Sequence, residues 1–202
     1  DKVRQRRDIH MERRKRAGMP MATLVGYTNA GKSTLFNALS ASDVIAQDQL
    51  FSTLDTITRK LRLASGGDLL LSDTVGFIQK LSPTVVAAFR ATLEELQGSD
   101  VLVHVIDVTH SKAAEQAQVV DNTLQELGLG GKPRVLVMNK MDLVDDNQIP
   151  THPTLIPTSD KYPVVFVSAR KKWNLDLVLE EIETHLMNND VNDTETLEDV
   201  SD

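Results

Sequence analysis

The chain has 202 residues, of which 41 % are hydrophobic and 25 % are charged, a balance typical of one folded domain with short tails. It contains no cysteine, which excludes disulfides, thiolate zinc sites and a cysteine nucleophile. No apolar run reaches the roughly 18 residues that span a bilayer, and the charged N-terminal segment is unlike a signal peptide. We therefore expect no membrane partner, and a location in the cytoplasm or in the soluble interior of an organelle.

The net charge of −7 is unevenly distributed along the chain. Residues 1–18 hold eight Lys or Arg and three acids, a charge of +5, which leaves −12 for the rest. Residues 190–202 hold six acids and no base. A basic head and an acidic tail indicate either an RNA-facing element with a solvated tail or simply two solvated ends, and composition does not decide between them.

Short apolar runs alternate with segments of helical periodicity. Strands are predicted at 21–25, 58–63, 69–71, 101–107, 134–138 and 164–167, and helices at 32–39, 82–97, 112–127 and 175–187. Residues 42–57 are predicted to form a long loop, and the turn at 65–67 predicts a hairpin between the second and third strands. The alternation predicts an α/β fold with a mostly parallel sheet, one antiparallel strand, and helices on both faces.

The most specific motif follows the first predicted strand. Residues 26–33 fit G-x-x-x-x-G-K-[ST] between a strand and a helix, as a phosphate-binding loop requires. Backbone N–H groups of such a loop surround phosphate oxygens at the positive end of the helix. The lysine would reach the β- and γ-phosphates, and the serine hydroxyl would bind Mg²⁺. The predicted nucleotide contacts in this loop and the following residue are Tyr27, Thr28, Asn29, Ala30, Gly31, Lys32, Ser33 and Thr34.

A second motif, Asp-Thr-Val-Gly, occupies residues 73–76 directly after the third predicted strand. The carboxylate of Asp73 would lie beside the phosphate-binding loop and hold Mg²⁺, usually through water. Gly76 would offer its N–H to the γ-phosphate, because it has no side chain to block the approach. The pattern D-x-x-G is common by itself. Its position after a strand, and after a phosphate-binding loop, is what favours a role at the phosphates here.

Two further motifs would read the base. The carboxylate of Asp142 can accept hydrogen bonds from N1–H and the 2-amino group of guanine, a donor pair that adenine lacks, so the site would select guanine. Asn139 and Lys140 would brace the base and the phosphate-binding loop. After the last predicted strand come Ser168, Ala169 and Arg170, where the N–H of Ala169 would meet guanine O6.

The long loop carries the candidates for a γ-phosphate sensor. Thr53, Thr56 and Thr58 could each complete the Mg²⁺ shell while the N–H of the same residue touches the γ-phosphate, and position alone does not choose among them. Phe77 stands where Ras-like enzymes place the glutamine that orients the attacking water. Because phenylalanine cannot hydrogen-bond water, we expect slow intrinsic hydrolysis.

Together these motifs predict a three-layer P-loop NTPase G domain, and the chain resembles the GTPase domain of the HflX family of ribosome-associated GTPases. The resemblance covers roughly residues 10–187. It selects Thr53 as the switch threonine. It rests on LVGYTNAGKSTLFN at 24–37, LFSTLD at 50–55, DTVGFI at 73–78, AFRATLEE at 88–95 and HVID at 104–107.

The resemblance implies a monomeric hydrolase that converts GTP to GDP and phosphate with Mg²⁺ and associates, as a nucleotide switch, with the large ribosomal subunit in ribosome splitting, rescue or biogenesis. Because Phe77 cannot orient the attacking water, the ribosome would position this water or neutralise charge. Alternatively, a K⁺ ion bound at Asn29 would do so, as in similar potassium-activated GTPases. Two alternatives stay open: a nucleotide-gated RNA or ribosome-binding module in which hydrolysis is incidental, and a GTPase of the related RNA-modification or ribosome-assembly groups.

The resemblance also suggests how the chain is divided. We expect residues 1–18 to be a basic helical connector from a missing N-terminal domain, residues 19–188 to be the GTPase domain, and residues 189–202 to be an acidic, disordered tail. Thr56 and Ser82 stand where the family usually has proline, and residues 171–174 replace its Gly-rich turn. Trp173, in that replaced turn, is expected to cover the core rather than to stack on the base.

Overall fold

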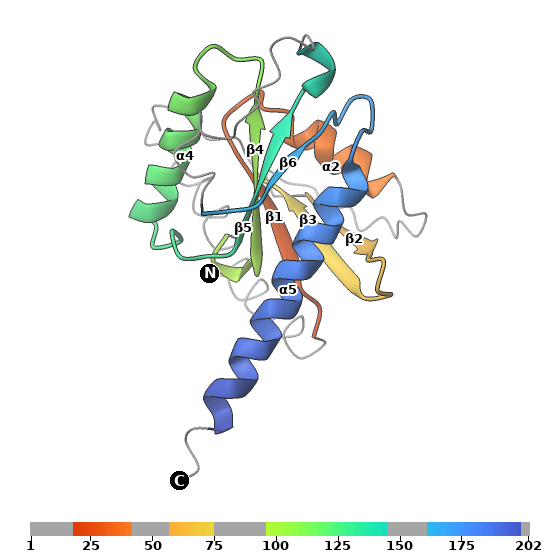
Figure 1. Cartoon of the computed structure of the whole chain (residues 1–202), viewed down its shortest axis with the longest axis vertical. Helices are drawn as coiled ribbons and strands as arrows, with labels where there is room; N and C mark the ends of the chain where they lie inside the picture. Colours follow the sequence, from red (N-terminus) through yellow and green to blue (C-terminus); the bar gives the residue numbers. More distant parts are fainter. Residues whose placement is uncertain (1–17, 42–56, 75–95, 145–160, 199–202) are drawn as a thin grey trace, which may run out of the picture.

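The computed structural model describes residues 18–41, 57–74, 96–144 and 161–198, with residues 188–198 described by their backbone only (Figure 1). Residues 42–56 of the predicted loop at 42–57, most of the helix at 82–97, and the predicted site residues Thr53, Gly76 and Phe77 lie outside the described residues. Predictions for these segments are therefore carried forward as predictions.

The observed elements match the predicted ones closely. The strands are β1 (Met21–Val25), β2 (Ile57–Arg62), β3 (Asp68–Asp73), β4 (Val101–Asp107), β5 (Arg134–Asn139) and β6 (Val164–Phe166). The helices are α2 (Lys32–Ser40), α4 (Ala113–Glu126), the short 3₁₀ turn η1 (Met141–Leu143) and α5 (Leu175–Glu198).

The strands form one six-stranded sheet in the order β2-β3-β1-β4-β5-β6. All neighbours are parallel except β2 and β3, which pair antiparallel as the predicted hairpin. The α/β prediction, with one antiparallel strand in a mostly parallel sheet, is confirmed. Because the parallel strands run in the same direction, their carboxyl ends meet at one edge, where Asp107 of β4 lies in register with Asn139 of β5.

Helices cover both faces of the sheet, as predicted (Figure 1). Successive residues of a strand point to opposite faces, so Val101 and Val103 of β4 join one hydrophobic cluster and Leu102 joins another. The larger cluster receives side chains from α2 and α5, including Leu35, Phe36, Val178 and Ile182. The smaller one receives Val120 and Leu124 from α4. A third cluster, formed by Ile106, Ala117 and Met138, lies near the carboxyl ends of β4 and β5, so separate cores on the sheet support the site edge.

The last helix is longer than predicted. We expected it to end near Met187, whereas α5 runs on to Glu198 and projects beyond the sheet (Figure 1). The physical reason is that no Gly or Pro follows Pro163, so nothing in the sequence terminates the helix. No helix in the described part of the chain, α5 included, is long and apolar enough to cross a membrane.

Candidate nucleotide-binding site

The phosphate-binding loop, residues 26–33, joins β1 to α2. Its two glycines adopt positive φ angles, +150° at Gly26 and +96° at Gly31, which side chains rarely allow. A Cβ at Gly26 would collide with the carbonyl oxygen of Val105, and one at Gly31 with the amide nitrogen of Asn139. The glycines of the motif are therefore required by close approaches from β4 and from the end of β5.

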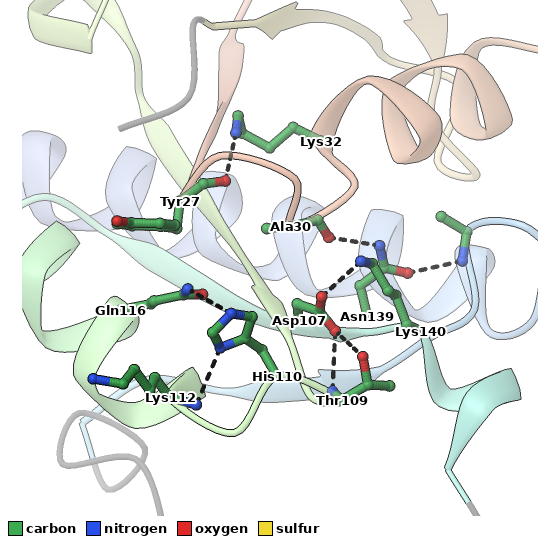
Figure 2. Close-up of polar contacts among 11 residues, drawn as sticks. Tyr27, Ala30, Lys32, Asp107, Thr109, His110, Lys112, Gln116, Asn139 and Lys140 are labelled. Atoms are coloured by element: carbon green, nitrogen blue, oxygen red, sulfur yellow. Dashed lines mark hydrogen bonds and ion pairs between the residues drawn. The ribbon is translucent and has the colours of Figure 1, made fainter. Parts of the chain in front are cut away.

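Lys32 lies almost fully buried under this loop. Its ammonium donates to the carbonyl oxygen of Gly26 at 3.1 Å and to that of Tyr27 at 2.9 Å; Figure 2 shows the bond to Tyr27. Burial lowers the pKa of Lys32 to about 8, although the nearby Asp73 carboxylate acts in the opposite direction. The lysine is therefore a buried cation held by two weak acceptors, ready to exchange them for stronger anionic ones.

Asp73 ends β3 beside the start of α2. Burial raises the pKa of its carboxyl group, while a hydrogen bond from Ser33, the charge of Lys32 and the N–H of Thr74 act to lower it. Among the described residues, its buried Oδ1 atom has no hydrogen-bond partner. An unsatisfied carboxylate oxygen next to a hydroxyl forms the hard oxygen donor set that Mg²⁺ prefers, so these two residues fit this ion.

Asn139 links three of the predicted motifs. Its amide nitrogen donates to the carbonyl oxygen of Ala30, and its amide oxygen accepts from the N–H of Ala169, both at 3.0 Å (Figure 2 draws both bonds). The side chain is buried, so both bonds lie away from water. The phosphate-binding loop, the end of β5 and the turn after β6 are thus held together through one side chain.

Asp142 and Ser168 connect the two base-reading motifs. The hydroxyl of Ser168 donates to Oδ1 of Asp142 at 2.5 Å and accepts from the N–H of Lys171 at 3.0 Å. Asp142 lies in η1, a turn that directly follows the left-handed Lys140, whose φ is 71°. This chain of bonds fixes the carboxylate of Asp142 relative to the turn at 168–171, which is the arrangement that a base-reading carboxylate needs.

The ammonium of Lys140 donates to Oδ2 of Asp107 at 2.6 Å (Figure 2). We expected Asn139 and Lys140 together to brace the base and the phosphate-binding loop; among the described contacts, Asn139 bonds to the loop and Lys140 bonds to Asp107. Asp107 was missed because a single acid at a strand end carries little information. A usable signal was present, since Asp107 and Asn139 end neighbouring parallel strands and must meet.

Trp173 does not cover the core, contrary to our expectation. Its side chain is 51 % exposed and borders a hollow of about 260 Å³, together with Asp142 and Phe166. The reason is a tight turn: the N–H of Trp173 bonds back to the carbonyl oxygen of Ser168, and the residues on either side have left-handed backbones. This turn directs the indole ring outward.

The remaining predicted residues lie around the same edge. Tyr27 is half-buried and packs against the cluster below α4, and Ala30 is buried. Thr28, Asn29, Ser33, Thr34 and Arg170 are exposed, as groups that contact a ligand can be. Of the three candidate threonines, only Thr58 is described; it lies on β2, where its hydroxyl donates to Ser72 at 3.4 Å.

No cluster of three or more metal-binding His, Cys, Asp or Glu side chains occurs in the described ranges. The fit for an ion therefore rests on Ser33 and Asp73 alone, with further ligands expected from phosphate oxygens and water. In phosphoryl-transfer sites, Mg²⁺ is normally bound by one or two protein oxygens in this way.

Comparison with known proteins identifies the family. The family described as 50S ribosome-binding GTPase matches residues 21–140. The GTPase HflX of Caldanaerobacter subterraneus subsp. tengcongensis is 43 % identical over 92 % of this chain and 41 % of its own length. The GTPase HflX of Escherichia coli is 44 % identical over 72 % of this chain and 34 % of its own length.

Solved structures agree with this assignment. A GTP-binding protein from Sulfolobus solfataricus, solved in complex with GDP, matches with a TM-score of 0.67 at 30 % identity, over 92 % of this chain and 58 % of that one. The chain spans about two fifths of the length of the curated relatives it matches. The chain therefore belongs to the 50S ribosome-binding GTPase family, and its recognition as an HflX-type GTPase domain is confirmed.

Proposed function

We propose that this chain binds GTP with Mg²⁺ at the carboxyl edge of its sheet and hydrolyses it to GDP and phosphate. The observation that carries the proposal is the convergence of four sequence motifs through side-chain contacts. Lys32 and the Ser33–Asp73 pair lie at one end, the Asn139 clamp lies in the middle, and the Asp142–Ser168 pair lies at the other. This arrangement suits one elongated ligand with an anionic end and a base.

At the phosphate end, Lys32 would exchange the carbonyl oxygens of Gly26 and Tyr27 for β- and γ-phosphate oxygens. The N–H groups of the phosphate-binding loop and the positive end of α2 favour the same anion. Ser33 and Asp73 would hold Mg²⁺, which neutralises phosphate charge, and Thr53 is proposed as a further ligand. The N–H of Gly76 is proposed as a γ-phosphate contact.

At the base end, Asp142 would accept the two guanine donors, N1–H and the 2-amino group. The contact from Ser168 occupies Oδ1 of Asp142 and fixes the orientation of the carboxylate. The N–H of Ala169 already donates to Asn139, so guanine O6 would have to share or replace that bond. Guanine selection is therefore proposed to rest mainly on Asp142.

For hydrolysis, water must attack the γ-phosphorus while the bond to the β–γ bridging oxygen breaks and GDP leaves with that oxygen. Phe77 offers no hydrogen bond to this water, so we propose slow intrinsic turnover. Asn29 is exposed in the phosphate-binding loop with a left-handed φ of 62°, a position from which its side chain oxygen could hold K⁺. Such an ion would supply positive charge next to the phosphates.

We further propose that the protein is a nucleotide switch that associates with the large ribosomal subunit. Support comes from the description of the matching family as 50S ribosome-binding GTPases and from HflX relatives at 41–50 % identity. These relatives favour HflX over the related RNA-modification and ribosome-assembly groups. Because Phe77 lacks the usual catalytic group, a nucleotide-gated binding module with incidental hydrolysis remains the second candidate.

Two experiments test these proposals. Asp142→Asn should weaken GDP binding and admit xanthosine diphosphate, since the amide can donate to the xanthine 2-oxygen. Unchanged GDP affinity in this variant would show that the base site is wrongly assigned. GTP turnover should then be measured with and without purified large ribosomal subunits: stimulation favours the switch, whereas subunit binding without stimulation favours the binding module.

A further inference from the structure

Asp107 is a buried carboxylate at the carboxyl end of β4, and its two oxygens serve two different segments. Oδ2 accepts from the ammonium of Lys140 at 2.6 Å. Oδ1 accepts from both the N–H of Thr109, at 3.0 Å, and its hydroxyl, at 2.6 Å. Figure 2 shows these three bonds converging on the one side chain. Asp107 therefore joins the guanine motif to the turn that leads into α4.

Lys140 is a residue whose side chain needs such an anchor. It follows β5 in a left-handed conformation and is 30 % exposed, so neither the sheet nor a helix restricts its four side-chain torsions. A free lysine side chain loses rotamer entropy when it is fixed. The Asp107 carboxylate fixes it in advance, two residues before Asp142.

The neighbouring backbone supports the same link. Asp107 and Asn139 are in register, and the N–H of Val108 donates to the carbonyl oxygen of Asn139 at 3.2 Å. The backbone of the guanine motif is thus held independently of the Asp107 side chain. Neutralising the carboxylate should release the lysine without dismantling the end of the sheet.

We propose that Asp107 is a positioning residue that holds Lys140 in its nucleotide-bound conformation and thereby slows the release of guanine nucleotide. The inference rests on the proposed function, because Lys140 must contact the nucleotide for its orientation to matter. Without Asp107, nucleotide binding would have to fix a flexible Lys140 side chain, and the loss of its conformational entropy would weaken binding.

The ionisation of Asp107 suits this role. Burial alone would raise the pKa of its carboxyl group, but the hydrogen bonds from Lys140 and Thr109 outweigh burial and leave the pKa below its ordinary value. Asp107 therefore carries its charge at neutral pH, so a charged acceptor faces Lys140 there.

The test uses the whole 202-residue chain and a fluorescent GDP analogue, whose dissociation is followed after a chase with unlabelled GDP. Asp107→Asn keeps an oxygen that can accept from Thr109 but turns an amide toward Lys140. Loss of this charge-assisted bond should speed dissociation about tenfold. Thr109→Val, which removes one bond to Asp107 and leaves the lysine pair, is the matched control and should stay within about twofold.

A double-mutant cycle separates positioning from a purely structural role. In the Lys140→Met background, Asp107→Asn should no longer change the dissociation rate, because the residue through which it acts is gone. An equal acceleration in both backgrounds, or none in the wild-type background, would overturn the proposal. Should Asp107→Asn fail to fold in a thermal melt, Asp107→Ser provides a second neutral variant, and the charged Asp107→Glu tests rescue.

The outcome is distinguishable from failure of the proposed function. If wild-type protein does not bind the GDP analogue at all, guanine nucleotide binding itself is refuted. If wild-type protein binds it and Asp107→Asn releases it at the wild-type rate, only the role of Asp107 is refuted.

Discussion

The substitution Asn139→Ala tests the side chain that holds three motifs together. Both of its hydrogen bonds are buried, and removing them leaves the carbonyl oxygen of Ala30 and the N–H of Ala169 without partners. Each unsatisfied buried group costs about 1–3 kcal/mol, so the sum is about 2–6 kcal/mol. Because alanine lets the loops relax, we expect a loss in the lower half of this range, about 3 kcal/mol.

The assay is equilibrium unfolding in urea without nucleotide, which separates folding from ligand binding. With a slope of about 2 kcal/mol/M, a loss of about 3 kcal/mol moves the midpoint down by about 1.5 M. Asn122→Ala is the matched control, because Asn122 is an exposed asparagine on α4 whose amide oxygen accepts from Gln118. It should cost no more than about 0.5 kcal/mol. An Asn139→Ala midpoint equal to that of the control would refute the idea that this residue clamps the site.

Three more predictions concern Lys32, Asp73 and Asn29. Lys32 has a pKa of about 8, and bound phosphates would raise it. The affinity for GDP should therefore fall as pH rises above 8, by up to about tenfold per pH unit. A GDP affinity that stays constant between about pH 8 and 9.5 would contradict this. Asp73→Asn should stabilise the protein without Mg²⁺ by about 1 kcal/mol in urea unfolding, since burial disfavours the charged carboxylate and its Oδ1 has no hydrogen-bond partner among the described residues. It should also abolish the effect of Mg²⁺ on GTP affinity, and retained Mg²⁺ dependence would exclude Asp73 as a ligand. Turnover of GTP should be faster in K⁺ than in Na⁺, and Asn29→Ala should remove the difference; equal rates in both salts for the wild-type protein would exclude a K⁺ site.

The ionisation of Lys32 also makes the stability of the folded chain depend on pH. Its pKa is lower in the folded chain than the ordinary value of 10.5, so the unfolded chain binds more protons between about pH 8 and 10.5. The contribution of Lys32 to the free energy of unfolding therefore rises with pH through this window. Nucleotide affinity and this contribution to stability should thus change in opposite directions.

The sheet was predictable because its strands are short apolar runs with clear ends. Strand β1 was predicted with its observed bounds, and the Ser65–Gly67 turn identified the antiparallel pair. The chemistry was predictable for the same reason, since each motif directly follows a strand and parallel strands must end at one edge. Local sequence and sheet topology together are sufficient to bring Lys32, Asp73 and Asp142 to one edge.

The features that were missed depend on contacts across the fold. The role of Asp107 follows from its contact with Lys140, which lies 33 residues away in the sequence. The N–H of Ala169 donates to the side chain of Asn139, a contact that sequence spacing could not predict. Trp173 was expected in the core because tryptophan usually packs there, but a tight turn overrides this preference. The length of α5 was underestimated because the amphipathic pattern ends before the helix does.

The most direct measurement of the central claim is isothermal titration calorimetry of the purified chain with GDP and ADP in the presence of Mg²⁺. If Asp142 reads the base and the phosphate-binding loop holds the phosphates, GDP should bind and ADP should bind at least about a hundredfold more weakly, because adenine leaves the Asp142 acceptor unpaired. Equal affinities for the two nucleotides, or no binding of either, would contradict the account.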